Sequence, residues 1–292
     1  MFVDAAFGGV VRRLAASRPQ QERPSSGRQL RLVEALEHPV LDLHSHVLPG
    51  IDDGPDTIEE SLELLRAAHA DGITQLVATP HVRADYPTAP AEMEARVAEL
   101  NEAAAAAGIP VDVLPGGELD LAHLLTLDDA TLRRFGLAGN PNLLLLEFPY
   151  HGWPAHLGEI VFRLQTRGFT LILAHPERNP AVQADPSSLD GFVDAGVLIQ
   201  LTAASVDGRL GKAAQQTAHE LLSRGSAHIV ASDAHAPSVR AIGLSHAAAT
   251  LRFPELVRWL TLDVPAALVA GEALPERPER RRTQRRVALA GA

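Results

Sequence analysis

The sequence predicts an α/β fold, with one barrel-like domain made of alternating strands and helices. Seven apolar runs of four to seven residues, the length of buried parallel strands, recur between residues 40 and 231. Helical stretches separate most of these runs, which favours a β/α barrel over the alternative, an open doubly wound sheet. The chain has 292 residues, enough for one such barrel and short flanking segments.

The expected elements can be given in chain order. The strands are Val40–Leu43, Ile73–Ala78, Val111–Leu114, Leu143–Leu146, Thr170–Ala174, Val197–Leu201 and His228–Ala231. The first helix should begin at Asp56 or Thr57, because Thr57 and Glu60 have the spacing of a capping box. Further helices are expected at Glu92–Ala107, Pro154–Arg167, Ser187–Ala195, Lys212–Arg224 and Val239–Leu251, and one or two within Pro254–Ala270.

We expect the domain to span residues 40–270, between an N-terminal extension (1–39) and an Arg-rich disordered tail (271–292). Residues 17–29 are rich in Pro, Ser, Gln and Arg, as flexible linkers are. No apolar run reaches the roughly 18 residues of a membrane span. The first arginine pair follows the short apolar start, which is the wrong order for a secretory signal. The cytoplasm is therefore the expected location.

The composition limits the chemistry. The chain has no cysteine, which excludes disulfides, Cys-ligated metals and a thiolate nucleophile. It has 13 histidines, so metal or proton chemistry would depend on His, Asp and Glu.

Side chains that can bind metals follow six of the seven expected strands. In a β/α barrel the carboxyl ends of all strands meet at one rim, where active sites lie. Two pairs of these residues, His44 with His46 and Asp233 with His235, are two positions apart and point the same way along an extended chain. Only the sixth strand, followed by Thr202, offers no strong ligand. The nine candidate ligands are His44, His46, Asp53, His81, Glu118, Glu147, His175, Asp233 and His235. Such a mixed imidazole and carboxylate set suits two or three divalent ions such as Mn, Zn or Fe.

The motifs around these residues resemble those of PHP-domain metallophosphoesterases. The resemblance is most specific to the bacterial protein-tyrosine phosphatases of capsule and exopolysaccharide operons, the CpsB/YwqE group. It covers about residues 40–270. The motifs are His-Ser-His at 44–46, Asp-Asp-Gly at 52–54, Ala-Thr-Pro-His at 78–81, Gly-Glu at 117–118, Leu-Glu-Phe-Pro at 146–149, Ala-His-Pro-Glu-Arg at 174–178 and Ser-Asp-Ala-His at 232–235.

The resemblance implies a PHP-type distorted seven-stranded (β/α)7 barrel with its active site at the carboxyl ends of the strands. It also implies two or three divalent ions, manganese in many members, with Fe, Zn, Co or Mg as alternatives. It assigns one ion to His44, His46, Glu118 and Asp233, a second to Asp53, His81 and His235, and a third to Glu118, Glu147 and His175. Arg178, inside a motif, and Arg240, five residues past His235, match the family's phosphate-binding arginines.

The resemblance further implies a metal-dependent phosphoester hydrolase, a protein-tyrosine phosphatase in which metal-bound hydroxide attacks phosphorus and phosphate is released. Its expected partner is the phosphotyrosine tail of a bacterial tyrosine autokinase that regulates capsule or exopolysaccharide synthesis. Three alternatives stay open: a small-molecule phosphomonoesterase such as a histidinol-phosphate phosphatase, a PHP nuclease, and a non-catalytic scaffold. No nucleic-acid partner is expected, because residues 40–270 hold 14 basic and 29 acidic residues. The sequence leaves a homo-oligomer open.

Overall fold

Parallel strands form two sheets in the part of the chain that the computed structural model describes, residues 36, 38–236 and 241–279. The first sheet, in the order β1-β2-β4, contains β1 (Val40–Ser45), β2 (Ile73–Ala78) and β4 (Asp112–Leu114). The second, in the order β3-β5-β6-β7-β8-β9, contains β3 (His81–Val82), β5 (Glu118–Asp120), β6 (Leu143–Glu147), β7 (Thr170–Ala174), β8 (Leu198–Thr202) and β9 (Ile229–Ala231). Every pairing between these strands is parallel.

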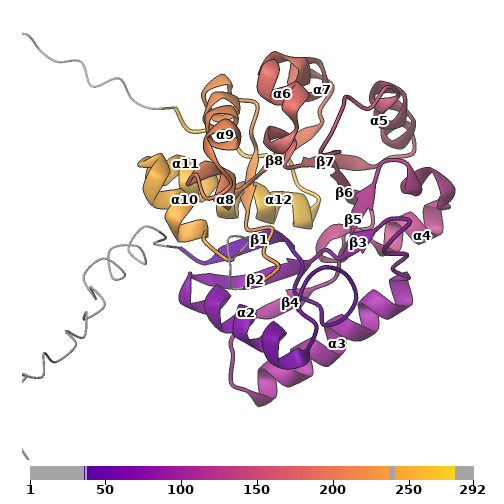
Figure 1. Cartoon of the computed structure of the whole chain (residues 1–292), viewed down its shortest axis with the longest axis vertical. Helices are drawn as coiled ribbons and strands as arrows, with labels where there is room; N and C mark the ends of the chain where they lie inside the picture. The colour runs from indigo at the N-terminus through magenta and orange to yellow at the C-terminus, as the bar shows by residue number, and fades with distance from the viewer. Residues whose placement is uncertain (1–35, 37, 237–240, 280–292) are drawn as a thin grey trace, which may run out of the picture.

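The two sheets are joined along the chain and at their edges. β3 follows β2 after two residues, and β5 follows β4 after three. At the other edge, Ser45 of β1 forms a parallel bridge with Ala234, beyond β9. Backbone hydrogen bonds from His46 N to Ala234 O (2.8 Å) and from Asp233 N to His44 O (2.9 Å) join the same segments. In Figure 1 the strands lie in the middle of the molecule, with the helices around them.

The helices begin with α2 (Ile58–Ala70), which has the predicted capping box. Thr57 Oγ1 accepts a hydrogen bond from Glu60 N, and Glu60 Oε2 accepts one from Thr57 N, both at 3.3 Å. The other α-helices are α3 (Pro90–Ala106), α4 (Asp129–Arg134), α5 (Leu157–Thr166), α6 (Pro180–Ala184), α7 (Asp190–Asp194), α8 (Ala203–Val206), α9 (Lys212–Arg224), α10 (Leu244–Leu251), α11 (Pro254–Arg258) and α12 (Val264–Ala270). The 3₁₀-helical segments are η1 (His123–Thr126), η2 (Leu137–Gly139), η3 (Pro176–Arg178) and η4 (Pro186–Leu189), and η5 (Trp259–Asp263) is π-helical.

The core lies between the strands and the helices that cover them. Leu143 to Leu146 of β6 are each at most 1% exposed, so this strand is buried on both faces, as strands of parallel α/β sheets are. Its continuous apolar run is the reason the sequence predicts it well. The strand β7 is likewise apolar and buried after its first residue, and the observed bounds of β2 and β7 are those expected.

The structure confirms all seven expected strands to within two residues at either end and adds two short ones, β3 and β5. Both additional strands are at most three residues long and follow loops that contain proline, so they give no periodic signal. The single helix expected at Ser187–Ala195 is wrong, because the segment divides into η4 and α7. The helix expected at Val239–Leu251 is α10 and starts at Leu244; the expected start lies outside the described residues.

Most of the two flanking segments lies outside the described residues, including the linker expected at 17–29. Residues 271–279, the first part of the expected tail, lie against α9 and η5. Trp259 Nε1 donates to Pro275 O at 3.0 Å, and Arg277 Nη2 donates to Leu222 O at 2.7 Å. The folded part therefore continues past the expected boundary at residue 270. Within the described residues, none of the helices has both the length and the apolar character required to cross a bilayer.

Candidate metal centre

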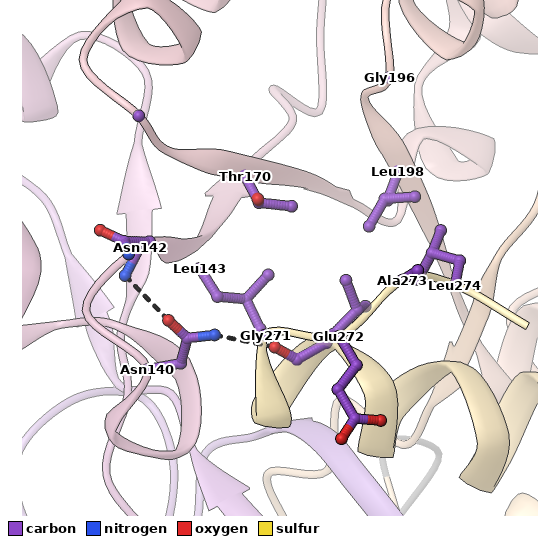
Figure 2. Close-up of a pocket in the computed structure, with 12 residues that line it drawn as sticks. Asn140, Asn142, Leu143, Thr170, Gly196, Leu198, Gly271, Glu272, Ala273 and Leu274 are labelled. Atoms are coloured by element: carbon purple, nitrogen blue, oxygen red, sulfur yellow. Dashed lines mark hydrogen bonds between the residues drawn. The ribbon is translucent and has the colours of Figure 1, made fainter.

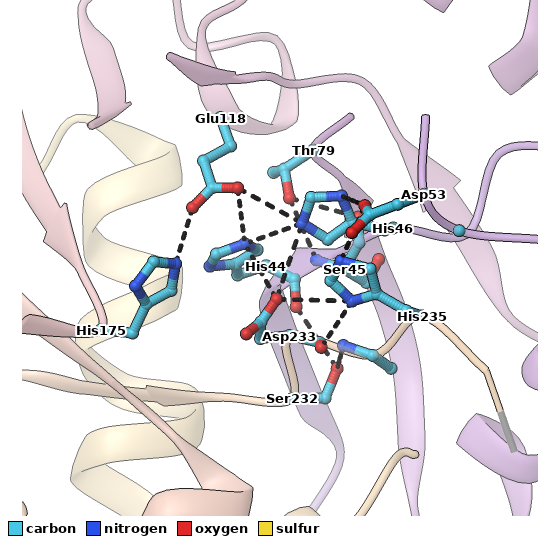
Figure 3. Close-up of polar contacts among 12 residues, drawn as sticks. His44, Ser45, His46, Asp53, Thr79, Glu118, His175, Ser232, Asp233 and His235 are labelled. Carbon is cyan, nitrogen blue, oxygen red and sulfur yellow. Dashed lines mark hydrogen bonds and ion pairs between the residues drawn. The ribbon is translucent and has the colours of Figure 1, made fainter. Parts of the chain in front are cut away.

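All nine predicted ligands lie together at the carboxyl ends of the strands. Eight of them are buried, and the side chain of Asp53 is 33% exposed. Figure 3 shows imidazoles and carboxylates from β1, β5 and the segments after β7 and β9 pointing toward one another. They come from elements far apart in the sequence, so the parallel topology is what collects them.

Glu118 is at the middle of this cluster. Its Oε2 atom lies 2.9 Å from His81 Nδ1, 3.4 Å from His46 Nε2 and 3.6 Å from His44 Nε2. Its Oε1 atom lies 2.8 Å from His175 Nε2. Oε2 is buried and makes no hydrogen bond to any described residue. A buried carboxylate oxygen that faces three imidazole nitrogens without hydrogen-bonding geometry fits a shared metal ligand better than a structural hydrogen-bond acceptor.

The ligand atoms form three groups within which all atoms lie at most 4.8 Å apart. The groups are His46, Asp53, His81 and His235; then His44, His46 and Glu118; and then His81, Glu118 and Glu147. Each contains at least two residues of one ion site implied by the family resemblance. Asp233 joins the cluster through His44, with Oδ1 3.5 Å from His44 Nε2. The residues present therefore fit a polynuclear metal centre.

Two of the histidines are oriented by side chains outside the predicted ligand set. His46 Nδ1 donates to Asp52 Oδ2 at 2.6 Å, and this carboxylate also accepts from His81 N at 3.0 Å. His44 Nδ1 donates to Gln200 Oε1 at 3.0 Å. Such partners hold the ring so that its other nitrogen points to the ion. Asp52 and Gln200 thus hold the Nε2 atoms of His46 and His44 toward Glu118.

Sequence reasoning missed Gln200. It belongs to the sixth expected strand, which offers no strong metal ligand. A signal was present, because Gln200 is a polar residue inside the otherwise apolar run Leu198–Leu201 and is 1% exposed. A buried amide in a core strand requires hydrogen-bond partners, and His44 is that partner.

Two of the predicted ligands have left-handed backbone conformations. The φ angle of His175 is 40° and that of Asp233 is 51°. Non-glycine residues rarely adopt this region, and each such residue costs of order 1 kcal/mol or more unless its surroundings hold it. Backbone hydrogen bonds do so here: His175 N donates to Gln200 O and Asp233 N to His44 O, both at 2.9 Å. Strain of this kind clusters at functional sites.

Several imidazoles of the cluster favour the protonated form. Burial alone would lower the pKa of His46, but the Asp52 carboxylate raises this pKa to about 10. Asp53 and Glu118 likewise outweigh burial and raise the pKa of His81 to about 9. At neutral pH these two cations offset part of the negative charge of the carboxylates, and a metal ion would have to displace their protons.

The carboxylates respond to the same charges. Burial would raise the pKa of Glu118, but the surrounding imidazoles, above all that of His44, hold this pKa well below the ordinary value. Burial and the charge of Glu118 raise the pKa of Glu147 to about 7. Burial and the Arg178 cation lower the pKa of His175 to about 4, so His175 is neutral at pH 7. A nearby cation would therefore favour the ionised form of Glu147.

Of the two predicted phosphate-binding arginines, Arg178 and Arg240, only Arg178 lies within the described residues. Arg178 forms an ion pair with Asp233, and its guanidinium lies 5.0 Å from the centre of the Tyr150 ring. It does not pair with its neighbour Glu177, which is buried and accepts a hydrogen bond from Thr202 N at 3.0 Å. Arg240 lies outside the described residues.

A further arginine, Arg83, also contacts the cluster and was missed by sequence reasoning. Its Nη1 atom lies 3.1 Å from Glu147 Oε1, and its Nε atom lies 2.8 Å from Asp85 Oδ1. The sequence signal was its position two residues after the ligand His81. The direction of a loop side chain cannot be read from such spacing alone.

Imidazoles and carboxylates thus gather at the carboxyl ends of parallel strands. The class of protein is therefore an α/β protein with a candidate polynuclear metal centre. The family model for capsular polysaccharide synthesis, CpsB/CapC, matches residues 40–253. The chain belongs to this family, which confirms the resemblance seen in its motifs.

The similar proteins are consistent with one another. Tyrosine-protein phosphatase YwqE of Bacillus subtilis is 34% identical over 197 residues, which cover 67% of this chain and 77% of YwqE. Tyrosine-protein phosphatase CpsB of Streptococcus pneumoniae is 26% identical over 202 residues, covering 67% of this chain and 83% of CpsB. A solved structure, one of the crystal structures of YwqE and CpsB that are described as metal-dependent tyrosine phosphatases, matches this chain with a TM-score of 0.75 and 30% sequence identity. It covers 82% of this chain and all (100%) of its own.

Proposed function

We propose that the chain is a metal-dependent protein-tyrosine phosphatase. The observation that carries the proposal is the convergence of nine imidazoles and carboxylates, with Glu118 at their middle, in a family whose similar members are named tyrosine-protein phosphatases. The proposed substrate is the phosphotyrosine tail of a bacterial tyrosine autokinase of capsule or exopolysaccharide synthesis, and phosphate is the product. The same proposal keeps the cytoplasmic location expected from the sequence.

We also propose that the two sheets together make the distorted seven-stranded barrel of PHP domains. β2 with β3, and β4 with β5, would each count as one interrupted strand, because only two or three residues separate their halves. The hydrogen bonds between β1 and the segment after β9 support closure of the ring.

The metal ligands in this proposal are the nine residues predicted from the sequence. One ion would be held by His44, His46, Glu118 and Asp233, a second by Asp53, His81 and His235, and a third by Glu118, Glu147 and His175. The mixed nitrogen and oxygen set fits manganese, with Fe, Zn, Co and Mg as alternatives. Such ions, when bound, acidify a water molecule and neutralise phosphoryl charge.

The residues of the chain supply binding and orientation. Arg178 is held at the edge of the cluster by Asp233 and Tyr150. A planar guanidinium can contact two phosphate oxygens at once, which suits it to hold the substrate phosphoryl group. We keep Arg240 as a second phosphate-binding residue on its sequence position alone. A phenolate leaving group needs little protonation, because the pKa of a phenol is near 10; no dedicated acid is required.

The test is turnover of p-nitrophenyl phosphate and of a phosphotyrosine peptide with added Mn²⁺, with and without a chelator. We expect turnover of both that the chelator abolishes. Absence of metal-dependent turnover of either substrate would contradict the proposal. Parallel assays on histidinol phosphate and single-stranded DNA test the alternative functions; a strong preference for either would replace the one proposed here.

A further inference from the structure

Two arginine–tyrosine pairs flank the metal centre. The chain has only two tyrosines, Tyr86 and Tyr150, and both lie against a predicted metal-ligand histidine. Each tyrosine ring also has an arginine guanidinium near its face. The repetition of one arrangement on two sides of the site indicates a shared purpose.

The pair formed by Arg178 and Tyr150 is the one already assigned to phosphate binding. The Tyr150 ring is almost parallel to the ring of His175, with centroids 5.7 Å apart and 13° between the planes. The guanidinium of Arg178 lies 5.0 Å from the Tyr150 centroid and pairs with Asp233. An arginine near an aromatic face is held by a cation–π interaction, so the ring directs the guanidinium toward the ligands.

The pair formed by Arg83 and Tyr86 repeats this geometry. The Tyr86 ring lies 5.8 Å from the ring of His81, with 19° between the planes. The guanidinium of Arg83 lies 5.1 Å from the Tyr86 centroid, and Arg83 pairs with Glu147. In both pairs, therefore, the tyrosine ring stacks on a histidine that is a predicted metal ligand. The arginine lies over this ring and forms an ion pair with a carboxylate that is also a predicted metal ligand.

The two pairs meet at one residue. Glu118 Oε2 is 2.9 Å from His81 Nδ1, on the side of Tyr86, and Glu118 Oε1 is 2.8 Å from His175 Nε2, on the side of Tyr150. The two arginine–tyrosine pairs are thus connected, through His81 and His175, to the two oxygens of the same central carboxylate. This places their positive charges around the same centre.

The local backbone holds Arg83 in this position. Arg83 N donates to Tyr86 O at 3.0 Å, and Tyr86 N donates to Arg83 O at 3.1 Å, which closes a four-residue turn. Thr88 Oγ1 fixes the end of this loop by donating to His81 O at 2.7 Å. The side chain of Arg83 is 25% exposed and that of Arg178 is 14% exposed. Both are partly accessible to a ligand that reaches the cluster.

We propose that Arg83 is a phosphate-binding residue of this site and that Tyr86 positions it. The inference rests on the proposed function and extends it: the phosphoryl group is held by guanidinium groups on two sides, Arg83 and Arg178. Two planar guanidinium groups can pair with more phosphate oxygens than a single arginine can. Glu147, the present partner of Arg83, is itself a proposed metal ligand, so a cation would compete with Arg83 for it.

The test measures the binding of inorganic phosphate to the Mn²⁺-loaded protein by calorimetry, together with KM for p-nitrophenyl phosphate and metal content. In Arg83→Gln we expect phosphate affinity to fall about 10-fold or more, because a charge-assisted contact is lost, and KM to rise in parallel at unchanged metal content. Arg83→Lys should recover only part of the loss. The matched control is Arg134→Gln, which removes a bidentate pair with Glu94 on the surface and should change neither value.

The role of Tyr86 is tested by two replacements. Tyr86→Phe keeps the aromatic face and should behave as the unmodified protein, whereas Tyr86→Leu removes it and should weaken phosphate binding about threefold. Unchanged phosphate affinity in Arg83→Gln would overturn the inference, as would loss of bound metal, since Arg83 would then only support Glu147. Absence of phosphate binding by the unmodified metal-loaded protein would overturn it too. Phosphate binding without turnover would refute the proposed function while leaving the role of Arg83 measurable.

Discussion

The carboxyl and amino ends of the strands hold side chains of different chemistry. At the carboxyl ends, five imidazoles and four carboxylates are packed together, with Glu118 at the middle. Figure 3 shows Glu118 between His175 on one side and His44 and His46 on the other. At the amino ends of β6, β7 and β8, a pocket of about 430 Å³ is lined by leucines, glycine turns, the uncharged polar residues Asn140, Asn142 and Thr170, and the end of α12 (Figure 2). Of the residues that line this pocket, only Glu272 is ionisable.

The difference shows how the fold separates two tasks. At the amino ends, the side chain of Asn140 bonds to backbone: Nδ2 donates to Leu268 O at 2.8 Å, and Oδ1 accepts from Asn142 N at 3.1 Å. These contacts close turns and fix α12. The polar groups at the carboxyl ends instead face one another, at a cost in desolvation and strain. In β/α folds the amino ends of the strands serve stability and the carboxyl ends serve chemistry. Mutations at the two ends should therefore affect different properties, and a mutation that affects both would contradict this separation.

The largest effect is expected for Glu118→Gln. This change keeps the shape of the side chain and removes the negative charge that faces His44, His46, His81 and His175. We expect bound metal to fall and turnover to drop by about 10³-fold or more, with the fold retained. Metal analysis and circular dichroism on the same sample measure both. Full activity in this variant would contradict the central role of Glu118.

At the amino ends the opposite result is expected. Leu143 is 1% exposed and lines the pocket, so Leu143→Ala should lower the free energy of unfolding by about 2–5 kcal/mol. Its distance from the site along β6 should leave metal content and KM unchanged. Denaturant titration and steady-state kinetics test the two halves of this statement. A large change in KM would show that the two ends are coupled.

A smaller effect is expected for Gln200→Leu, which removes the hydrogen bond to His44 Nδ1. Loss of an outer partner of a metal-bound histidine costs about 10–100-fold in metal affinity. The volume is nearly kept, so stability should change little. Titration with Mn²⁺ measures the affinity, and Gln200→Glu provides a control that retains an acceptor. Unchanged affinity in Gln200→Leu would mean that His44 needs no orientation.

The mildest probe is pH. The folded-state pKa values of His46 and His81 are raised, to about 10 and about 9. Their contribution to the stability of the metal-free protein is therefore complete below the ordinary value of about 6.5 and is lost as pH rises through 9 to 10. A bound ion needs the neutral rings, so metal affinity should rise between pH 6 and pH 9, about tenfold per unit for each proton released. Calorimetry in two buffers counts the protons; release of none would contradict this reading.

The sequence predicts the strands and the ligands well for one physical reason. Buried parallel strands are continuous apolar runs, and their carboxyl ends meet wherever they lie in the chain. For that reason Glu118 and Asp233, 115 residues apart in number, could be assigned to one site before their positions were known. The short strands β3 and β5 lack such a run and were not predicted.

The supporting contacts could not be predicted because they depend on side-chain direction across long sequence distances. Gln200 and His44 are separated by 156 positions, and nothing in either local sequence specifies the other. Arg83 reaches Glu147 only because a four-residue turn stacks it on Tyr86. The positions of residues relative to the strands predict which of them lie together at the carboxyl ends. Side-chain packing then determines which of these residues orient the predicted metal ligands.

The central claim, a polynuclear metal centre at the carboxyl ends of the strands, is tested most directly by locating the ions. Crystals of the Mn²⁺-loaded protein would be measured at the manganese absorption edge, with metal analysis of the same sample. We predict two or three anomalous peaks among the nine ligands and two or three ions per chain. Fewer than two ions, or peaks away from Glu118, would contradict the account.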